Sequence, residues 1–432
     1  MQPEAIVFPI IRQVLKRPRL ADALFKWDRW GNQLGPERYS WPYPGYEKIR
    51  ADGPVAWHRL YNMWFVTGYE EARTVLSSPD ARVESQLDLL LVIPPYTKLA
   101  DHSKEMLRLF LLLVDPPQHT RLRGLVSRAF TPRQVARLEP SVKSLVSDLL
   151  DAVDDEPEPD LFAALAKPLP VQVISELIGV PRERWPWMQR MSTEVVKLLN
   201  PFVTFDPATV DAAMVELDVY FRELAAQRRA GPAEDLITAL ALVEDEGDRL
   251  SELELVSMVA FLLFAGHETT TGLIGTSLIA LARYPEQRRQ LLDDPSLWDT
   301  AVEELVRWDT PVQNDPRAFV VDTEIGGVTV KAGDAMSVML GAANRDPRVF
   351  TEPNTLRLDR DEGAPVSFGH GIHYCVGAAL ARMELRAAIE AVLERYGEYT
   401  IDDSAIEWRE ALMARAPETV PVRREVSSQL PT

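Results

Sequence analysis

The segment Phe368-Gly-His-Gly-Ile-His-Tyr-Cys-Val-Gly377 contains the only cysteine of this 432-residue chain. A strong helix-forming run, Ala378–Glu384, follows directly, so Cys375 is predicted to lie just before a helix N-terminus. Helix-end N–H groups and the macrodipole lower the pKa of a thiol, and a metal or an electrophile requires the thiolate. Glycines on both sides of the sulfur would let a flat ligand approach the backbone closely: Gly369, Gly371 and Gly377.

A single thiol in this position has several possible roles. A buried cysteine most often only packs in a core, whereas a thiolate could act as the nucleophile of a hydrolase or as a metal ligand. Because Cys375 has no second thiol in the chain, an internal disulfide and a CxxC zinc or redox pair are excluded. We therefore expect the protein to work in a reducing compartment.

The charge and hydropathy of the chain exclude several kinds of partner. Lys and Arg number 47 against 65 Asp and Glu, a formal charge of −18, which disfavours nucleic acids and anionic membranes. The longest nearly apolar run, Leu255–Ala265, is shorter than the ~20 residues that cross a bilayer. At the N-terminus an acid precedes a short apolar stretch broken by Pro9, unlike a secretory signal. We expect a cytoplasmic protein with no transmembrane segment and no nucleic-acid partner.

Most of the chain has the periodicity of amphipathic helices. Apolar residues recur at three- and four-residue spacing over Lys143–Ala152, Leu161–Ile178, Val210–Arg229 and Trp298–Arg307. Strand patterns are fewer, namely a hairpin over Val55–Thr67, an alternating stretch over Phe319–Ser337 and short strands within Tyr399–Val422. The predicted fold class is mainly α with small β-sheets. We expect one domain over residues 1–432, with an N-terminal extension of about residues 1–20 and a polar C-terminal tail of about residues 423–432.

The clearest helix begins after Ser251, which forms a capping box with Glu254, and ends at Pro285. At ~1.5 Å per residue this helix is long enough to cross a whole globular domain. The polar stretch Ala265–Thr271 interrupts its apolar face near the middle. A polar surface would explain that interruption, and so would a buried site.

The pattern FxxGxxxCxG, made by Phe368, Gly371, Cys375 and Gly377, resembles the haem-binding loop of the cytochrome P450 family. The resemblance implies a cytochrome P450 fold in which haem b lies between the long central helix and the Cys loop with its following helix. In that family the cysteine thiolate is the axial ligand of the haem iron, which makes Cys375 the predicted metal ligand.

Other segments resemble motifs of the same family in the same order along the chain. Glu304 and Arg307 match the ExxR pair, a structural ion pair that the family completes with a later arginine, Arg360 in this sequence. Basic residues match positions that hold the haem propionates: His119, Arg123, Arg317 and His373.

The resemblance also assigns chemistry to the polar stretch of the long helix. Glu268 and Thr269 match the family's acid–alcohol pair, in which the hydroxyl holds dioxygen and ordered water and the acid relays protons. Ala265 and Gly266 would leave room for dioxygen above the porphyrin. His267 is interpreted as structural.

These matches imply a haem-thiolate monooxygenase that uses dioxygen and two externally supplied electrons to hydroxylate or epoxidise a hydrophobic molecule, whether steroid, terpenoid, fatty or polyketide-like. Gln313 and Asn314 could anchor polar groups of that substrate. The electrons would come from a ferredoxin-type partner with its reductase, docking on a basic patch drawn from Arg121, Arg128, Arg133, Arg137 and Arg382. A peroxide-driven peroxygenase and a non-catalytic haem-thiolate sensor remain alternatives.

Overall fold

The computed structural model describes residues 37–199, 205–244, 247–409 and 415–424. The N-terminal extension expected at about residues 1–20 lies outside these ranges, as does most of the expected C-terminal tail. Arg423 and Arg424 do not belong to such a tail, because they form strand β9 (Val422–Arg424). That strand pairs with β8 (Tyr399–Ile401) in antiparallel register, Tyr399 opposite Arg424.

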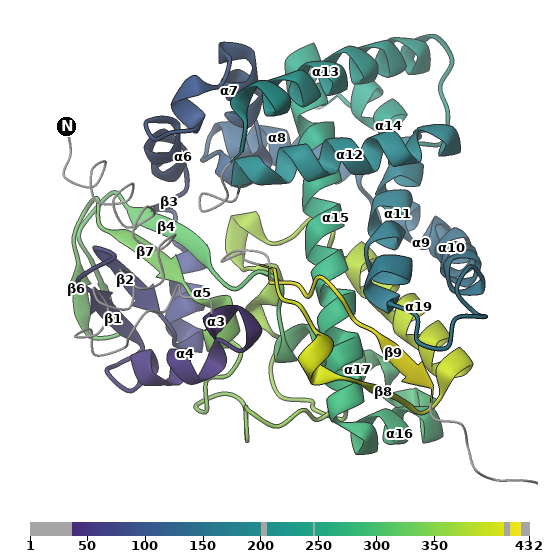
Figure 1. Cartoon of the computed structure of the whole chain (residues 1–432). Coiled ribbons are helices and arrows are strands. Elements are labelled where there is room, and N and C mark those ends of the chain that lie inside the picture. Colours follow the sequence, from purple (N-terminus) through teal and green to yellow (C-terminus); the bar gives the residue numbers. More distant parts are fainter. Residues whose placement is uncertain (1–36, 200–204, 245–246, 410–414, 425–432) are drawn as a thin grey trace, which may run out of the picture.

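Helices make up most of the described chain, as the periodicity predicts (Figure 1). The N-terminal half contains α3 (Glu37–Ser40), α4 (Tyr43–Arg50), α5 (Tyr69–Ser77), α6 (Glu84–Leu91), α7 (Asp101–Leu107), α8 (Gln118–Ala129), α9 (Pro132–Arg137), α10 (Glu139–Asp151), α11 (Pro168–Ile178) and α12 (Trp185–Val195). The C-terminal half contains α13 (Pro207–Ala230), α14 (Leu236–Leu242), α15 (Glu252–Arg283), α16 (Pro285–Asp293), α17 (Trp298–Trp308), α18 (Leu340–Ala343) and α19 (Ala378–Tyr396).

Helix α15 crosses the whole molecule and packs against α11, α12, α13 and α19. In Figure 1, α12 runs across the upper half of α15, and α11 and α19 lie to its right. The predicted capping box is confirmed: the Ser251 hydroxyl accepts from the Glu254 N–H, and the Glu254 carboxylate accepts from the Ser251 N–H. By length and composition α15 could also cross a membrane, but 72% of its most apolar window is buried inside the protein. That burial is typical of the core helix of a soluble protein.

The sheets join segments that are distant in the sequence. The predicted hairpin is confirmed as β1 (Val55–His58) and β2 (Met63–Val66), with Asn62 in the turn at a φ of 51°. Strand β2 runs parallel to β7 (Ala335–Val338), which pairs in turn with β4 (Asp315–Phe319) and through it with β3 (Ala81–Arg82). Strands β5 (Thr323–Ile325) and β6 (Val328–Val330) form a separate hairpin.

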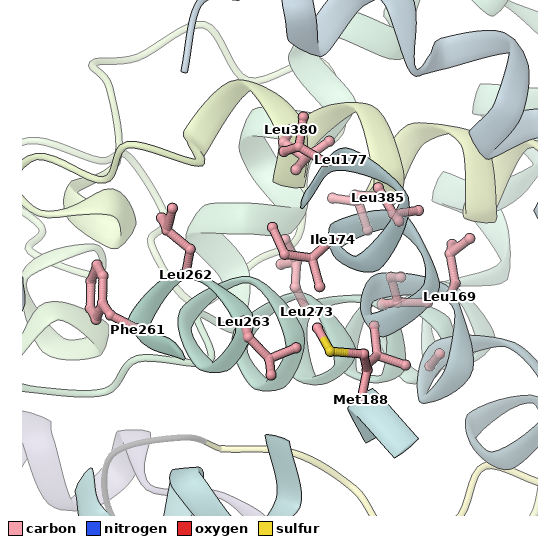
Figure 2. Close-up of a cluster of buried hydrophobic side chains, with 14 of the residues drawn as sticks. Leu169, Ile174, Leu177, Met188, Phe261, Leu262, Leu263, Leu273, Leu380 and Leu385 are labelled. Atoms are coloured by element: carbon pink, nitrogen blue, oxygen red, sulfur yellow. The ribbon is translucent and has the colours of Figure 1, made fainter. Parts of the chain in front are cut away.

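One large hydrophobic core surrounds α15. Figure 2 shows Leu169, Ile174 and Leu177 of α11 packed between Leu263 and Leu273 of α15 and Leu380 and Leu385 of α19. Smaller clusters of apolar side chains lie under the five-stranded sheet and around α4. The core thus holds α15 and α19 together, and these helices carry the polar stretch and the cysteine loop, respectively.

Candidate active site

The cysteine loop, Phe368–Gly377, follows one short 3₁₀ turn (Val366–Phe368), contains a second (Gly371–His373), and ends where α19 begins. The Cys375 N–H donates to the carbonyl oxygen of Phe368 (2.9 Å), which closes the loop around the sulfur. Gly371 has a φ of +71°, and a Cβ at this position would lie 2.4 Å from the carbonyl oxygen of Leu76 in α5. Gly371 is therefore required by the close approach of the loop to α5, a reason that the sequence did not reveal.

Burial raises the pKa of the Cys375 thiol, contrary to the expectation from the helix N-terminus. The Gly377 N–H and the charges of Arg123 and Arg382 act in the opposite direction, but they do not outweigh the loss of water. The expectation was wrong because it counted the helix end and neglected desolvation. A thiolate at this site needs a further positive charge, which a bound metal ion supplies.

A cluster of basic side chains lies beside the cysteine loop. The His119 ring, in α8, is 4.2 Å from the ring of His373, centroid to centroid. Arg123 donates to the carbonyl oxygen of Tyr374 (2.7 Å), and Arg317 is buried in β4, where it pairs with Asp315. The structure thus brings together the four residues predicted to hold propionates.

The electrostatics of this basic cluster are unfavourable without anions. Burial and the charge of Arg123 lower the pKa of His119 to about 4. Burial, reinforced by Arg317, His119 and Arg123, lowers the pKa of His373 to about 3. Both ring nitrogens of His119 and Nε2 of His373 are buried without a hydrogen-bond partner in the described part of the chain. Buried polar atoms of this kind normally have partners.

These observations fit haem b. The propionates of a porphyrin would supply hydrogen-bond partners for the orphaned imidazole nitrogens and further acceptors for the two guanidinium groups. A porphyrin iron would supply the positive charge that the half-buried Cys375 lacks. The donor set of this chain therefore suits an iron porphyrin with two carboxylates.

The polar stretch of α15 contains the predicted acid–alcohol pair. Thr269 donates from Oγ1 to the carbonyl oxygen of Ala265 (2.7 Å), and α15 is continuous through this stretch. A Cβ at Gly266 would lie 3.6 Å from Ile174, an ordinary contact, so packing against α11 does not demand glycine there.

The carboxylate of Glu268 is buried and forms an ion pair with Arg409. His267 is also buried and structural in its contacts: Nδ1 lies 2.8 Å from the Ser192 hydroxyl, and Nε2 lies 3.3 Å from the carbonyl oxygen of Lys167. The sequence reasoning missed Arg409 and Ser192. No periodicity or motif marks either residue, since each meets α15 only through the tertiary fold.

The ExxR residues form a buried ion-pair cluster. Arg307 donates to both oxygens of Glu304, with its Nη2 at 2.8 Å from Oε1, and Arg360 donates to the same carboxylate (3.1 Å). Arg307 also donates to the carbonyl oxygens of Asn344 and Pro353. The cluster fixes the segment between α18 and the cysteine loop against α17.

One suggested substrate contact is corrected by the structure. Gln313 is buried, its Oε1 accepts from the Tyr46 hydroxyl (2.9 Å), and its Nε2 donates to the carbonyl oxygen of Thr310 (2.6 Å). Because both the oxygen and the nitrogen of the amide already have protein partners, Gln313 stabilises the segment just before β4 and is not a substrate anchor.

Comparisons with known proteins agree with this site. The family model described as Cytochrome P450 matches residues 57–413. The cytochrome P450 monooxygenase PikC of Streptomyces venezuelae is 39% identical over 402 residues, 90% of this chain and 92% of that protein. The vitamin D(3) 25-hydroxylase of Pseudonocardia autotrophica is 38% identical over 390 residues, covering 88% and 93%.

Solved structures show the same architecture. The crystal structure of CalO2 has a TM-score of 0.85 at 31% identity, covering 91% of this chain and 98% of that one. The structure of P450BioI with a fatty-acid-ligated acyl carrier protein has a TM-score of 0.82 at 33% identity, covering 90% and 99%. The chain belongs to the cytochrome P450 family and is a haem-thiolate monooxygenase that binds haem b and oxidises a hydrophobic molecule.

Proposed function

We propose that the Cys375 thiolate would bind the haem iron and that Glu268 and Thr269 deliver protons during oxidation of a large hydrophobic molecule. The observation that supports this proposal best is the cluster of the buried His119 and Arg317 with the half-buried Arg123 and His373, beside the only thiol of the chain. A hydrolase that used Cys375 as its nucleophile would have no need of four basic groups gathered beside it, two of them buried.

When bound, a haem with a thiolate ligand supplies the activation and cleavage of dioxygen. The chain contributes the sulfur of Cys375 and positions the group through Phe368 and the glycines of the cysteine loop. The basic cluster holds the propionates. The Thr269 hydroxyl orients water at the centre of α15, and the Glu268 carboxylate passes protons to that water from the side of Arg409.

The reduced, carbon monoxide-treated spectrum tests the assignment of Cys375. Replacement of this residue by serine should abolish the thiolate-type spectrum, because the 432-residue sequence has no second sulfur donor of this kind. Turnover with a surrogate ferredoxin and its reductase then separates an enzyme from a sensor. Retention of the thiolate spectrum in C375S would contradict the proposal.

We propose a macrolide-like or secosteroid-like molecule as the substrate class. The support is similarity to proteins named 6-deoxyerythronolide B hydroxylase, 35% identical over 394 residues, and vitamin D(3) 25-hydroxylase. Phe261, Phe110 and Leu262 contribute apolar surface near the middle of α15. A panel of macrolactones, secosteroids and fatty acids, read by the spin shift when water leaves the iron, should give the largest response with the first two classes. A response confined to fatty acids would contradict this assignment.

We further propose a cytoplasmic location and a ferredoxin-type redox partner that docks on the sulfur side of the haem. Arg128 of α8 and Arg133 of α9 are both exposed, so their side chains are accessible to a docking partner. Replacing both by glutamine should slow reduction several-fold at low salt, with little effect at high salt. Lys331→Gln is the control, because Lys331 is exposed in the turn between β6 and β7, and the haem of this variant should be reduced at the normal rate. Equal reduction rates at low salt for the unmodified enzyme, the double variant and the control would exclude this surface.

A further inference from the structure

A cavity lies beside the C-terminal half of α15, in the region where this helix approaches α16 and α17 (Figure 1). Its volume is about 320 Å³, at the lower end of the range of roughly 300–1,000 Å³ that is typical of small-molecule pockets. None of the residues of the candidate active site lines it. Thr276, which does line it, follows Thr269 by two turns of α15, about 10 Å along the helix axis. The cavity is therefore separate from the candidate active site, and we call it the Trp308 cavity.

Aromatic rings form much of the wall of the Trp308 cavity. Trp308, the last residue of α17, is buried, and the Tyr284 ring packs against it edge to face at 5.4 Å between centroids. The Trp41 ring lies 6.0 Å from the Trp308 ring at an interplanar angle of 49°. Ile279 and Ala280 of α15 add an aliphatic surface. Rings at such angles beside aliphatic side chains provide a surface on which a flat aromatic molecule packs well.

The charges around the cavity disfavour a cationic occupant. The guanidinium group of Arg345 lies 4.0 Å from the centroid of the Trp308 ring and 5.1 Å from that of the Trp41 ring, so both π systems already have a cation. The lining carboxylate, Asp309, accepts hydrogen bonds from Nε (2.7 Å) and Nη2 (3.1 Å) of Arg415. Because these rings and this carboxylate have partners within the protein, a cationic ligand would gain little from them.

Arg283, in the last turn of α15, gives the opening of the cavity a positive charge. Its side chain is 36% exposed, whereas Trp308 and Thr276 are buried, which places the opening on the Arg283 side. Arg283 donates from Nε to Asp403 (3.0 Å), but the Asp403 side chain is itself 61% exposed. A pair of exposed ions is weak, because water competes for both groups. A carboxylate that is held in place by the aromatic wall would compete for the same guanidinium group.

We propose that the Trp308 cavity binds a flat aromatic monocarboxylate, with its ring system against Trp41, Tyr284 and Trp308 and its carboxylate on Arg283. This ligand is distinct from the molecule that the enzyme oxidises. Its binding joins the end of α15 to α17 and to the segment before α4. The proposal does not depend on the roles proposed for Glu268 and Thr269.

Equilibrium dialysis of the haem-loaded protein against 2-naphthoate tests the site. An excess of 4-phenylimidazole, which ligates haem iron, keeps the active site occupied throughout. One naphthoate should bind per chain under these conditions, and the cationic 2-naphthylmethylamine should bind at least about tenfold more weakly. Absence of saturable naphthoate binding, or its displacement by 4-phenylimidazole, would overturn the proposal.

Two variants distinguish the carboxylate contact from the aromatic wall. Arg283→Gln should weaken naphthoate binding by about fivefold and leave the binding of the uncharged 2-naphthamide unchanged. Ala280→Leu places a larger side chain in the cavity and should abolish the binding of both probes. Arg289→Gln is the matched control, because it removes an exposed pair with Glu398 on the neighbouring helix α16. Equal weakening of both probes in R283Q, or weakening in R289Q as large as in R283Q, would contradict the contact with Arg283.

Thermal unfolding gives a second readout that does not depend on activity. A ligand that binds only the folded protein raises its unfolding temperature as the ligand concentration increases. Naphthoate should produce this rise in the unmodified protein and in R289Q but not in A280L. If A280L does not fold, Trp41→Ala takes its place, because it removes a half-buried ring from the wall and should weaken the binding of both probes. A rise in A280L or W41A as large as in the unmodified protein would locate the naphthoate elsewhere and overturn the proposal.

Discussion

Thr269 is the residue whose chemistry depends most directly on its position in α15. Its hydroxyl donates to the carbonyl oxygen of Ala265 one turn earlier (2.7 Å), which leaves the oxygen lone pairs free to accept from water. The neighbouring Glu268 points elsewhere, toward Arg409. Acid and alcohol are thus adjacent in sequence but face different surroundings, and ordered water has to connect them.

The Thr269 variants test this arrangement at the scale of one hydroxyl group. Thr269→Ala should keep the haem spectrum and the fold, but it should raise the share of electrons lost to hydrogen peroxide several-fold, because protons no longer arrive in order. Thr269→Ser retains a hydroxyl and should restore most of the coupling. Product formation as fully coupled in T269A as in the unmodified enzyme would contradict the role of Thr269.

At the scale of elements, the most consequential contact is the buried cluster that joins α17 to the loop after α18. Arg360 donates to Glu304 and also to the carbonyl oxygens of Thr351, Glu352 and Thr355. One guanidinium group therefore satisfies a buried acid and several backbone groups. Loss of the Arg360 guanidinium group would leave the Glu304 carboxylate and these carbonyl oxygens with fewer hydrogen-bond partners in a buried environment.

Arg360→Gln should destabilise the haem-loaded protein by about 3 kcal/mol or more, since breaking one side of a buried ion-pair cluster typically costs about 3–5 kcal/mol. Arg357→Gln is the matched control, because Arg357 is 33% exposed and pairs with Asp359 and Glu362 at the surface. Its loss should cost less than about 1 kcal/mol. Denaturant unfolding measures both, and equal costs would contradict a special role for the buried cluster.

A second contact between elements predicts a pH dependence. Arg348 binds the carboxylates of Glu71 in α5 and Asp346 after α18. The hydrogen bonds from Arg348 lower the pKa of Glu71, although burial acts in the opposite direction. Burial raises the pKa of Asp346, but the hydrogen bonds from Arg348 and from the Tyr69 N–H outweigh this effect, so the pKa of Asp346 is also lowered. A lowered carboxyl pKa stabilises the fold above the unfolded value of about 4 and loses that effect as the pH falls further.

Arg348→Gln should therefore cost stability at pH 7 and progressively less below about pH 4, where both acids become protonated in the unfolded chain. Since 49% of Arg348 is exposed, we expect the cost at pH 7 to be only about 1 kcal/mol. Urea unfolding at several pH values measures it. Arg73→Gln, which removes the exposed pair with Glu70 on the same helix, should show almost no effect at any pH; a cost for R348Q that does not change with pH would contradict the assignment.

At the scale of the whole molecule, several contacts join segments that lie far apart in the sequence. Strand β2 pairs with β7, Asp160 forms a bridge with Pro421, and Arg415 binds the carbonyl oxygen of Ser40 and the carboxylate of Asp309. The acidic segment around residues 156–160 is bound to the C-terminal region by the Asp160–Pro421 bridge, by the Val420 N–H that donates to Asp160, and by the ion pair of Glu158 with Arg423. We propose that the chain is one domain.

Unfolding of the haem-loaded protein should then follow a single transition. Loss of helix, measured by circular dichroism, and loss of the haem absorption band should have the same midpoint, because the basic cluster and the cysteine loop come from α8, β4 and the segment before α19. Two well-separated transitions, with one retaining bound haem, would contradict a single domain.

The local sequence is sufficient for features that depend on neighbouring residues. Short-range spacing predicts the capping box of α15, the β1–β2 hairpin, the helical segments and the cysteine before a helix start. Resemblance to the family's residue patterns supplies the proposed site residues. Such patterns record periodicity and turn chemistry, which act within a few residues of chain.

The tertiary structure alone shows how burial and long-range contacts change those residues. Desolvation reverses the expected pKa shift of Cys375. The amide of Gln313 is hydrogen-bonded to the Tyr46 hydroxyl and the Thr310 carbonyl oxygen. Glu268 pairs with Arg409, which lies far from it in the sequence. These effects depend on which atoms exclude water and which charges become neighbours after folding. The spacing of residues along the chain contains neither piece of information.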